Sequence, residues 1–316
     1  MKRGDRMVVS AALGAWGAFI AWFGMSAAPH QLAKDFTWPW RAARILLEGH
    51  DPYVAMAASG PYPFNVGLFY PLPAGILALP FAPLEPALAG ALFIGVSSAL
   101  LAWAVSGSAP HRLWLFASAP FAMAALLGQW SPILTAAALL PALQFVIAAK
   151  PNIGLVAWLY RPSWRGAGGA VALGLVSLAV LPRWPLEWLQ ALQDAPRYRG
   201  PAFSLAGAFT LLAVLRWRRP EGRLMIGMAL VPQLALFYDQ LPVWLVPDTW
   251  KRTALLSALS WVAWGFWYPS SALASSVPAA TPWILVLIYA PALLMLLTAR
   301  AAATAPAPNE RAPNAA

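Results

Sequence analysis

The chain has no cysteine, only three histidines and few charged residues among its 316. Without cysteine it can form neither a disulfide nor a thiolate metal site, and it has no cysteine nucleophile. The histidines, His30, His50 and His111, are too scattered to suggest a metal site. Charged residues make up 10% of the chain, whereas a soluble domain carries about a quarter. A water-soluble domain is therefore not expected.

Apolar residues dominate the chain: 60% of it is hydrophobic, and the mean hydropathy is +0.63. Runs of roughly 17–25 apolar residues recur from end to end, which is typical of membrane-spanning helices. We expect an all-α, polytopic integral membrane protein with about 10–12 transmembrane helices. Residues 1–300 are expected to form a single membrane-embedded domain, and the Ala/Pro-rich residues 301–316 a disordered cytoplasmic tail.

The net charge of +10 comes from basic residues that cluster between the apolar runs. This clustering follows the positive-inside rule, so it indicates cytoplasmic segments and no nucleic-acid partner. Both termini are then cytoplasmic, in a multi-pass protein of the cell (plasma or inner) membrane. Residues 7–25 are too long for the apolar core of a usual signal peptide and predict an uncleaved first helix.

The expected spans alternate with two external loops, over about residues 28–70 and 183–200. Spans are predicted near 7–27, 71–82, 87–106, 113–127, 167–182, 201–215, 253–268 and 282–299. Two more are predicted, one before and one after residues 237–240. Prolines and a lysine interrupt residues 131–160, which indicates two short helices there or one kinked helix with a re-entrant piece. The second external loop is predicted to hold a short interfacial helix.

The first external loop contains a predicted amphipathic helix. Thr37 can cap it, Pro39 suits its first turn, and Gly49 suits the position just past its end. The helical spacing places Trp40, Ala43 and Leu47 on one apolar face. Such a helix lies in the membrane surface with its apolar side down, and it would hold Asp35 close to the headgroup plane.

Several short motifs, of which this helix is part of the first, occur in a particular order along the chain. They are Asp35 with the aromatic-rich helix, residues 48–53 (EGHDPY), Tyr62-Pro63, residues 70–73 (YPLP), 128–132 (GQWSP) and 149–152 (AKPN), and Tyr238-Asp239. Their order and spacing over about residues 1–250 resemble glycosyltransferase family 87, which has the membrane-embedded GT-C architecture. The chain is shorter than expected for that family, and its later loops are short.

This resemblance implies a polyprenyl-phosphate sugar as donor, a lipid or glycan as acceptor, and transfer on the external face, with mannose as the sugar by family analogy. The attacking hydroxyl must lose a proton, so a carboxylate can act as general base. Asp35 matches the family's acidic residue after the first span, although a helix-capping carboxylate is the alternative. Asp51 is expected to shape the loop, with donor or acceptor binding as the alternative, while His50 and Tyr53 are candidates to line the sugar site.

The donor's phosphate calls for a nearby cation. Lys150 lies within an apolar run, where a lysine is costly and usually functional, although it could also snorkel from a helix end. Arg183, Arg197 and Arg199 are further candidates, because they run against the positive-inside trend. Asp239 lies at a span end and could face the same cavity. Gln129, in the GQWSP motif, could line the same site or could form a hydrogen bond between helices.

No cofactor and no obligatory metal are expected, because no acidic pair indicates a divalent ion. No glycine-rich phosphate loop precedes a strand, so a lipid-linked donor suits the chain better than a nucleotide sugar. A transporter or flippase of a lipid-linked molecule is the alternative function, although no internal repeat indicates one. An inactive family relative that acts as a membrane assembly partner is a third.

Overall fold

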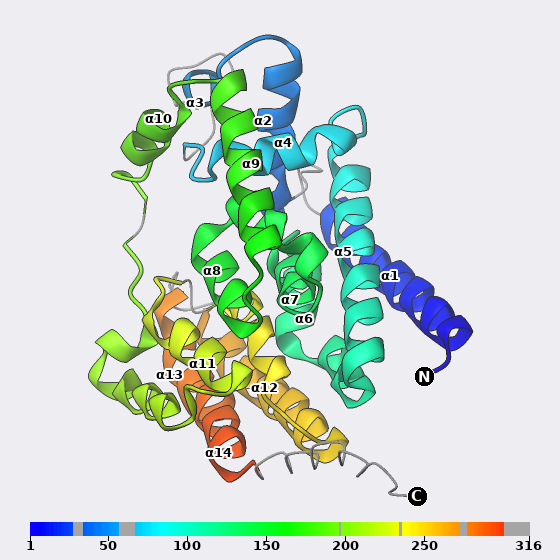
Figure 1. Cartoon of the computed structure of the whole chain (residues 1–316), viewed down its shortest axis with the longest axis vertical. Coiled ribbons are helices and arrows are strands. Elements are labelled where there is room, and N and C mark those ends of the chain that lie inside the picture. Colours follow the sequence, from blue (N-terminus) through cyan, green and yellow to red (C-terminus); the bar gives the residue numbers. More distant parts are fainter. Residues whose placement is uncertain (28–33, 57–66, 196, 234–235, 272–276, 300–316) are drawn as a thin grey trace, which may run out of the picture.

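The computed structural model describes residues 1–316 except 28–33, 57–66, 196, 234–235, 272–276 and 300–316. Within those described ranges every regular element is a helix, which confirms the all-α prediction (Figure 1). Tyr62-Pro63 and the tail 301–316 lie outside the described residues. The α-helices are α1 (Arg3–Ser26), α2 (Thr37–Leu47), α3 (Pro52–Ala55), α4 (Leu72–Ala78), α5 (Pro86–Ser108), α6 (Ala119–Leu126), α7 (Ser131–Leu139), α8 (Pro151–Tyr160), α9 (Trp164–Val180), α10 (Trp184–Ala191), α11 (Pro220–Leu230), α12 (Trp250–Ser271), α13 (Thr281–Ile284) and α14 (Ala290–Thr298).

Shorter 3₁₀ and π segments connect these helices. The 3₁₀ segments are η1 (Lys34–Phe36), η2 (Leu79–Phe81), η3 (Pro110–Ala117), η4 (Pro141–Ala149), η5 (Pro201–Phe203), η6 (Leu205–Arg216), η7 (Tyr238–Leu245) and η8 (Val277–Ala280), and η9 (Leu285–Tyr289) is a π segment. Most 3₁₀ helices are no longer than a turn or so, whereas η6 has 12 residues. At about 2.0 Å of rise per residue, η6 extends about 24 Å.

Three of the described helices are long and apolar enough to cross a membrane: Arg3–Ser26, Pro86–Ser108 and Thr281–Thr298. A fourth candidate is the pair Trp164–Val180 and Trp184–Ala191, which bends by 98° between its halves. These helices agree with a membrane protein. The expected count of about 10–12 spans and the GT-C architecture stay predictions.

Prolines divide two regions more finely than the sequence analysis expected. The span predicted near 113–127 is broken at Ser118 between η3 and α6, where the Ser118 hydroxyl caps α6 by accepting from the Phe121 amide at 3.3 Å. Residues 131–160 form three segments, α7, η4 and α8, because Pro141 and Pro151 each begin a new one. A proline cannot donate the helical hydrogen bond and so favours such starts.

Helices α1 and α5 lie side by side and antiparallel, joined by small residues (Figure 1). A Cβ added at Gly14 would meet Ala99 Cβ at 2.9 Å, and one at Gly95 would meet Ala18 Cβ at 3.0 Å. Each helix therefore presents a small residue every fourth position, the spacing that lets membrane helices approach closely. Arg6 donates to the Trp103 carbonyl at 2.9 Å and ties the start of α1 to the end of α5.

The predicted helix of the first external loop is α2, and Gly49 follows it with φ +77° as expected. Two of the three residues on its predicted apolar face, Trp40 and Ala43, pack into the protein. Trp40 is 3% exposed and donates to the Phe81 and Leu84 carbonyls at 3.2 Å, whereas Leu47 is 65% exposed. The predicted Thr37 cap is wrong, because the N-cap is Phe36 and the Thr37 hydroxyl is buried without a partner.

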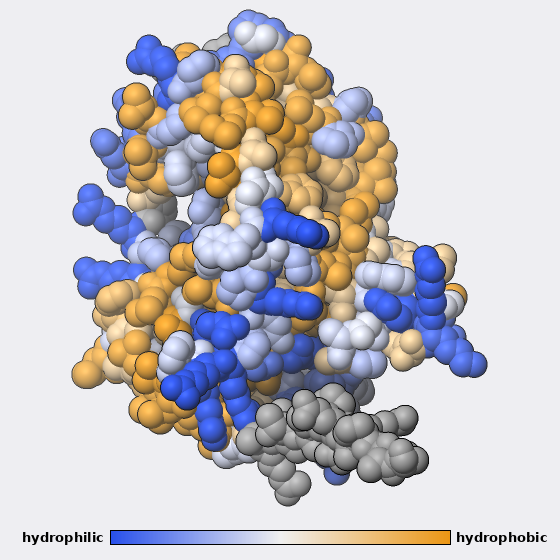
Figure 2. Space-filling model, viewed as in Figure 1, coloured by the Kyte–Doolittle hydropathy of each residue, from blue (hydrophilic) through white to orange (hydrophobic). Residues whose placement is uncertain are grey.

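Hydrophobic side chains cover much of the face shown in Figure 2, interrupted by separate groups of hydrophilic ones. Helix α9 illustrates this exposure, because only Gly166 and Ser177 of its 17 residues are buried. Val171 and Leu175 are 62% and 60% exposed. An apolar surface of this extent suits contact with lipid.

Candidate functional site

Four polar side chains far apart in the sequence meet in what we call the polar network: Asp35, Gln129, Lys150 and Asp239. The Gln129 amide nitrogen donates to Asp35 Oδ2. Lys150 Nζ lies 2.6 Å from Asp239 Oδ1 and 3.4 Å from Gln129 Oε1. Gln129 and Asp239 are each 1% exposed, and the Lys150 side chain is 15% exposed. The network is thus largely shielded from water.

Asp35 belongs to η1, the first described segment after the spanning helix α1. Its backbone N–H donates to the Leu127 carbonyl at 3.0 Å, which docks η1 onto the turn between α6 and α7. Lys34, immediately before it, has φ +51°. Positive φ is sterically unfavourable for a residue with a Cβ.

Gln129 reaches Asp35 because the chain reverses sharply after α6. Gly128 has φ +63°, a conformation that glycine adopts without steric cost. The Gln129 N–H donates to the Ala124 carbonyl at 2.9 Å and closes the turn. The next residue, Trp130, is 1% exposed and packs edge-on against Phe93, which anchors the turn in the core.

Lys150 and Asp239 also come from the ends of helices. Lys150 stands between η4 and α8, two segments that both begin with proline. Asp239 lies in the first turn of η7. Just before it, Phe237 has φ +55° and ψ −57°, and the Tyr238 N–H donates to the Leu236 carbonyl at 2.6 Å. These values describe a γ-turn of the rare, strained type.

Backbone strain in the described residues is concentrated at the polar network. Lys34 and Phe237 are the only residues other than glycine with positive φ in that part of the chain, and each lies within two positions of a network carboxylate. Such conformations cost about 1–3 kcal/mol each and persist where surrounding structure fixes them, commonly at functional sites.

Burial raises the pKa of Asp35 from 3.8 to about 6. The Lys150 ammonium opposes this shift, the Asp239 charge adds to it, and Lys34 opposes it further. A carboxyl group with this pKa is mostly ionised at neutral pH and can accept a proton, as a general base must. The neighbouring ammonium of Lys150 can pair with an anion.

Three tyrosines, Tyr70, Tyr198 and Tyr238, lie within electrostatic reach of both network carboxylates. Burial, followed by the charges of Asp35 and Asp239, raises the pKa of Tyr70, and the same three causes raise that of Tyr198. Tyr198 is 41% exposed and lies between Arg197 and Arg199, which are both exposed. The sequence analysis selected these arginines but missed Tyr198. Its position between Arg197 and Arg199 was the available signal.

The other predicted site residues lie apart from the polar network. Asp51 is the N-cap of α3 and accepts from the Tyr53 N–H at 2.8 Å, which agrees with its predicted role in shaping the loop. The Tyr53 hydroxyl donates to the Tyr70 carbonyl at 2.9 Å, so Tyr53 supports the loop that carries Tyr70. His50 is exposed to solvent.

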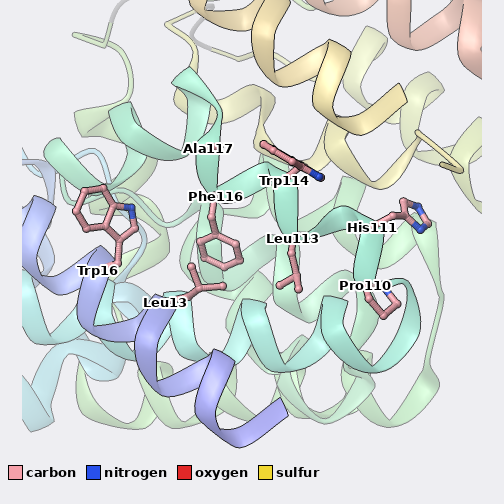
Figure 3. Close-up of a pocket in the computed structure, with 8 residues that line it drawn as sticks. All are labelled: Leu13, Trp16, Pro110, His111, Leu113, Trp114, Phe116 and Ala117. Atoms are coloured by element: carbon pink, nitrogen blue, oxygen red, sulfur yellow. The ribbon is translucent and has the colours of Figure 1, made fainter. Parts of the chain in front are cut away.

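No group of three or more His, Cys, Asp or Glu side chains suited to a metal occurs among the described residues. A groove of about 560 Å³ lies elsewhere, between α1 and η3 (Figure 3). Leu13 and Trp16 from α1 and Trp114 and Phe116 from η3 line it, with His111 at one end. Its lining holds no carboxylate or ammonium group, so the polar network is the candidate functional site.

Together, the fold and the polar network define an all-α protein that has helices apolar enough to span a membrane and a shielded polar site at helix ends. No protein-family model, curated protein or solved structure matches the chain. The resemblance to glycosyltransferase family 87 therefore stays a prediction. Any function has to be argued from the chemistry of the polar network.

Proposed function

We propose that the chain is an integral membrane glycosyltransferase of GT-C type. It moves a sugar, mannose by family analogy, from a polyprenyl-phosphate donor to a lipid or glycan acceptor. The reaction takes place on the external face of the cell membrane, with both termini in the cytoplasm. It uses no cofactor and no obligatory metal.

One observation carries this proposal: Asp35, Gln129, Lys150 and Asp239 converge in one shielded network, although up to 94 residues separate neighbours within it. A carboxylate that can act as base thus lies near an ammonium group that can hold a phosphate. A base and a cation in this arrangement assist transfer from a lipid phosphate to a hydroxyl. Their position beside the first spanning helix suits a donor that is itself in the membrane.

In the proposed reaction, the acceptor hydroxyl attacks the anomeric carbon of the donor sugar. Its proton passes to the Asp35 carboxylate as the new carbon–oxygen bond forms. The bond between the anomeric carbon and the donor phosphate oxygen breaks, and polyprenyl phosphate leaves with an additional negative charge. Lys150 stabilises that charge, and Arg197 and Arg199, on either side of Tyr198, are further candidates to contact the same phosphate.

The test is a transfer assay with purified protein in nanodiscs, radiolabelled polyprenyl-phosphate-mannose and total cell-envelope lipid. Wild type is compared with Asp35→Asn, which keeps the side chain's size but cannot accept the proton. A matched control is Asp248→Asn, because Asp248 lies in a partly exposed ion pair with Arg252, outside the polar network. We expect transfer by wild type and the control, and loss of about 10²–10⁴-fold in the Asp35 variant.

Equal transfer by wild type and a folded Asp35→Asn variant would remove Asp35 as the base. If neither protein transfers label, the assay is repeated with other lipid-linked sugars. Movement of intact donor across the bilayer, without transfer, would instead support the transporter function.

A further inference from the structure

We propose that Gln129 is a positioning residue that holds the Asp35 carboxylate in one orientation, with Oδ2 occupied and Oδ1 turned toward the acceptor hydroxyl. This inference rests on the proposed role of Asp35 as the base. It gives a function to a buried amide that would otherwise be a simple interhelical contact.

Both ends of the Gln129 amide are engaged. Its nitrogen donates to Asp35 Oδ2, and its oxygen lies 3.4 Å from Lys150 Nζ. Because an amide oxygen cannot donate and an ammonium group cannot accept, these partners fix which way the amide faces. Asp35 Oδ1 accepts no hydrogen bond from the described residues. One oxygen of the base is therefore held while the other is left for chemistry.

The backbone holds the two residues together independently of the side-chain contact. The Asp35 N–H donates to the Leu127 carbonyl at 3.0 Å, two residues before Gln129. Gly128 then directs the chain so that the Gln129 side chain returns to the carboxylate. The turn and η1 thus form one docked unit. Its geometry does not depend on Gln129 alone, so removing the amide should leave the fold in place.

Gln129 is uncharged, so its effect on Asp35 can be separated from that of the surrounding charges. The titratable groups that affect Asp35 or feel its charge are Lys34, Lys150, Asp239, Tyr70, Tyr198 and Tyr238. A hydrogen bond donated to a carboxylate favours its charged form. Loss of the Gln129 amide should therefore make Asp35 harder to ionise while every charged neighbour stays in place.

The experiment measures the pH dependence of carbodiimide labelling at Asp35, since carbodiimides react with protonated carboxyl groups, and mass spectrometry locates the label. The variants are Gln129→Met, which keeps about the same volume, and Gln129→Leu; neither side chain can donate a hydrogen bond to Asp35. We expect both to raise the pH midpoint of Asp35 labelling by about one unit or more. The acid limb of the transfer rate should move upward equally, with donor KM unchanged.

The matched control is Gln144→Met, because Gln144 is also fully buried and its amide donates to the Arg161 carbonyl, away from Asp35. Its labelling midpoint at Asp35 should equal that of wild type. An unchanged midpoint in both Gln129 variants overturns the positioning role. Labelling needs neither donor nor acceptor, so this failure is distinct from an absence of transfer, which would count against the proposed function.

Discussion

The ion pair between Lys150 and Asp239 should stabilise the fold asymmetrically. Lys150→Met would leave Asp239, whose side chain is 2% exposed, as a shielded carboxylate without its cation. Asp239→Asn should be milder, because Lys150 keeps its contact with Gln129 and lies 5.2 Å from the centre of the Tyr238 ring. A double variant, Lys150→Met with Asp239→Leu, removes both charges together.

The expected size of the effect follows from this shielding. Breaking a buried pair by removing one partner costs about 3–5 kcal/mol, whereas replacing both with apolar residues can be neutral. Lys150 retains some exposure, 15% of its side chain, so we expect about 3 kcal/mol for Lys150→Met. The double variant should recover most of that loss. The control is Arg252→Met, which breaks the more exposed Arg252–Asp248 pair and the Arg252 bonds to the Met295 carbonyl and the Thr298 hydroxyl. It should cost about 1–2 kcal/mol, less than Lys150→Met.

The assay is equilibrium unfolding by SDS in mixed micelles, followed by far-ultraviolet circular dichroism. Free energies of unfolding are compared for wild type, the two single variants, the double variant and the control. The reasoning is refuted if Lys150→Met costs no more than Arg252→Met. It is refuted equally if the double variant is less stable than Lys150→Met, because a stranded charge would then not be the cause.

Three further predictions concern titration and the backbone. The transfer rate should fall below pH about 6 as Asp35 takes up a proton, and a pH–rate profile with its acid limb near pH 4 would contradict this. Burial raises the pKa of Glu187, and the charge of the neighbouring Asp51 raises it further. Protonated Glu187 therefore contributes to the stability of the fold. This contribution is lost as the pH rises through the pKa that Glu187 has in the folded protein. Glu187→Gln should flatten thermal stability against pH, and an unchanged slope would refute the coupling. Gly128→Ala should lower the free energy of unfolding by about 1–2 kcal/mol because residue 128 has a positive φ. Gly174→Ala, in open space on α9, should leave it unchanged. Equal SDS unfolding midpoints for the two variants would count against strain at Gly128.

Local sequence patterns predicted the helices better than their packing. The run at residues 7–25 lies inside α1, and Pro39 and Gly49 stand at the two ends of α2 as expected. The apolar face of α2 could not be assigned to membrane or protein, because both environments select the same residues. Thr37 failed as a cap because Phe36 takes that position and the Thr37 hydroxyl is enclosed.

The candidate site was predictable in its members but not in its contacts. Lys150 was selected because a charge is costly among apolar residues. Asp35 was selected through the resemblance to the glycosyltransferase family, and Asp239 because it lies at a predicted span end. Their pairing depends on folding over 89 and 94 residues, and no local pattern encodes it. The γ-turn at Phe237 could not be predicted from the sequence for a related reason, because the surrounding fold imposes a backbone conformation that phenylalanine does not prefer.

The distance between Lys150 and Asp239 along the chain has a consequence for biogenesis. Lys150 leaves the ribosome 89 residues before its partner. At about 5–20 residues per second, Asp239 follows about 4–18 seconds later. During that interval the nascent chain must keep an unpaired ammonium group near water or in the insertion machinery. The ion pair can therefore close only after residue 239 has been made, so this part of the fold is completed late in synthesis.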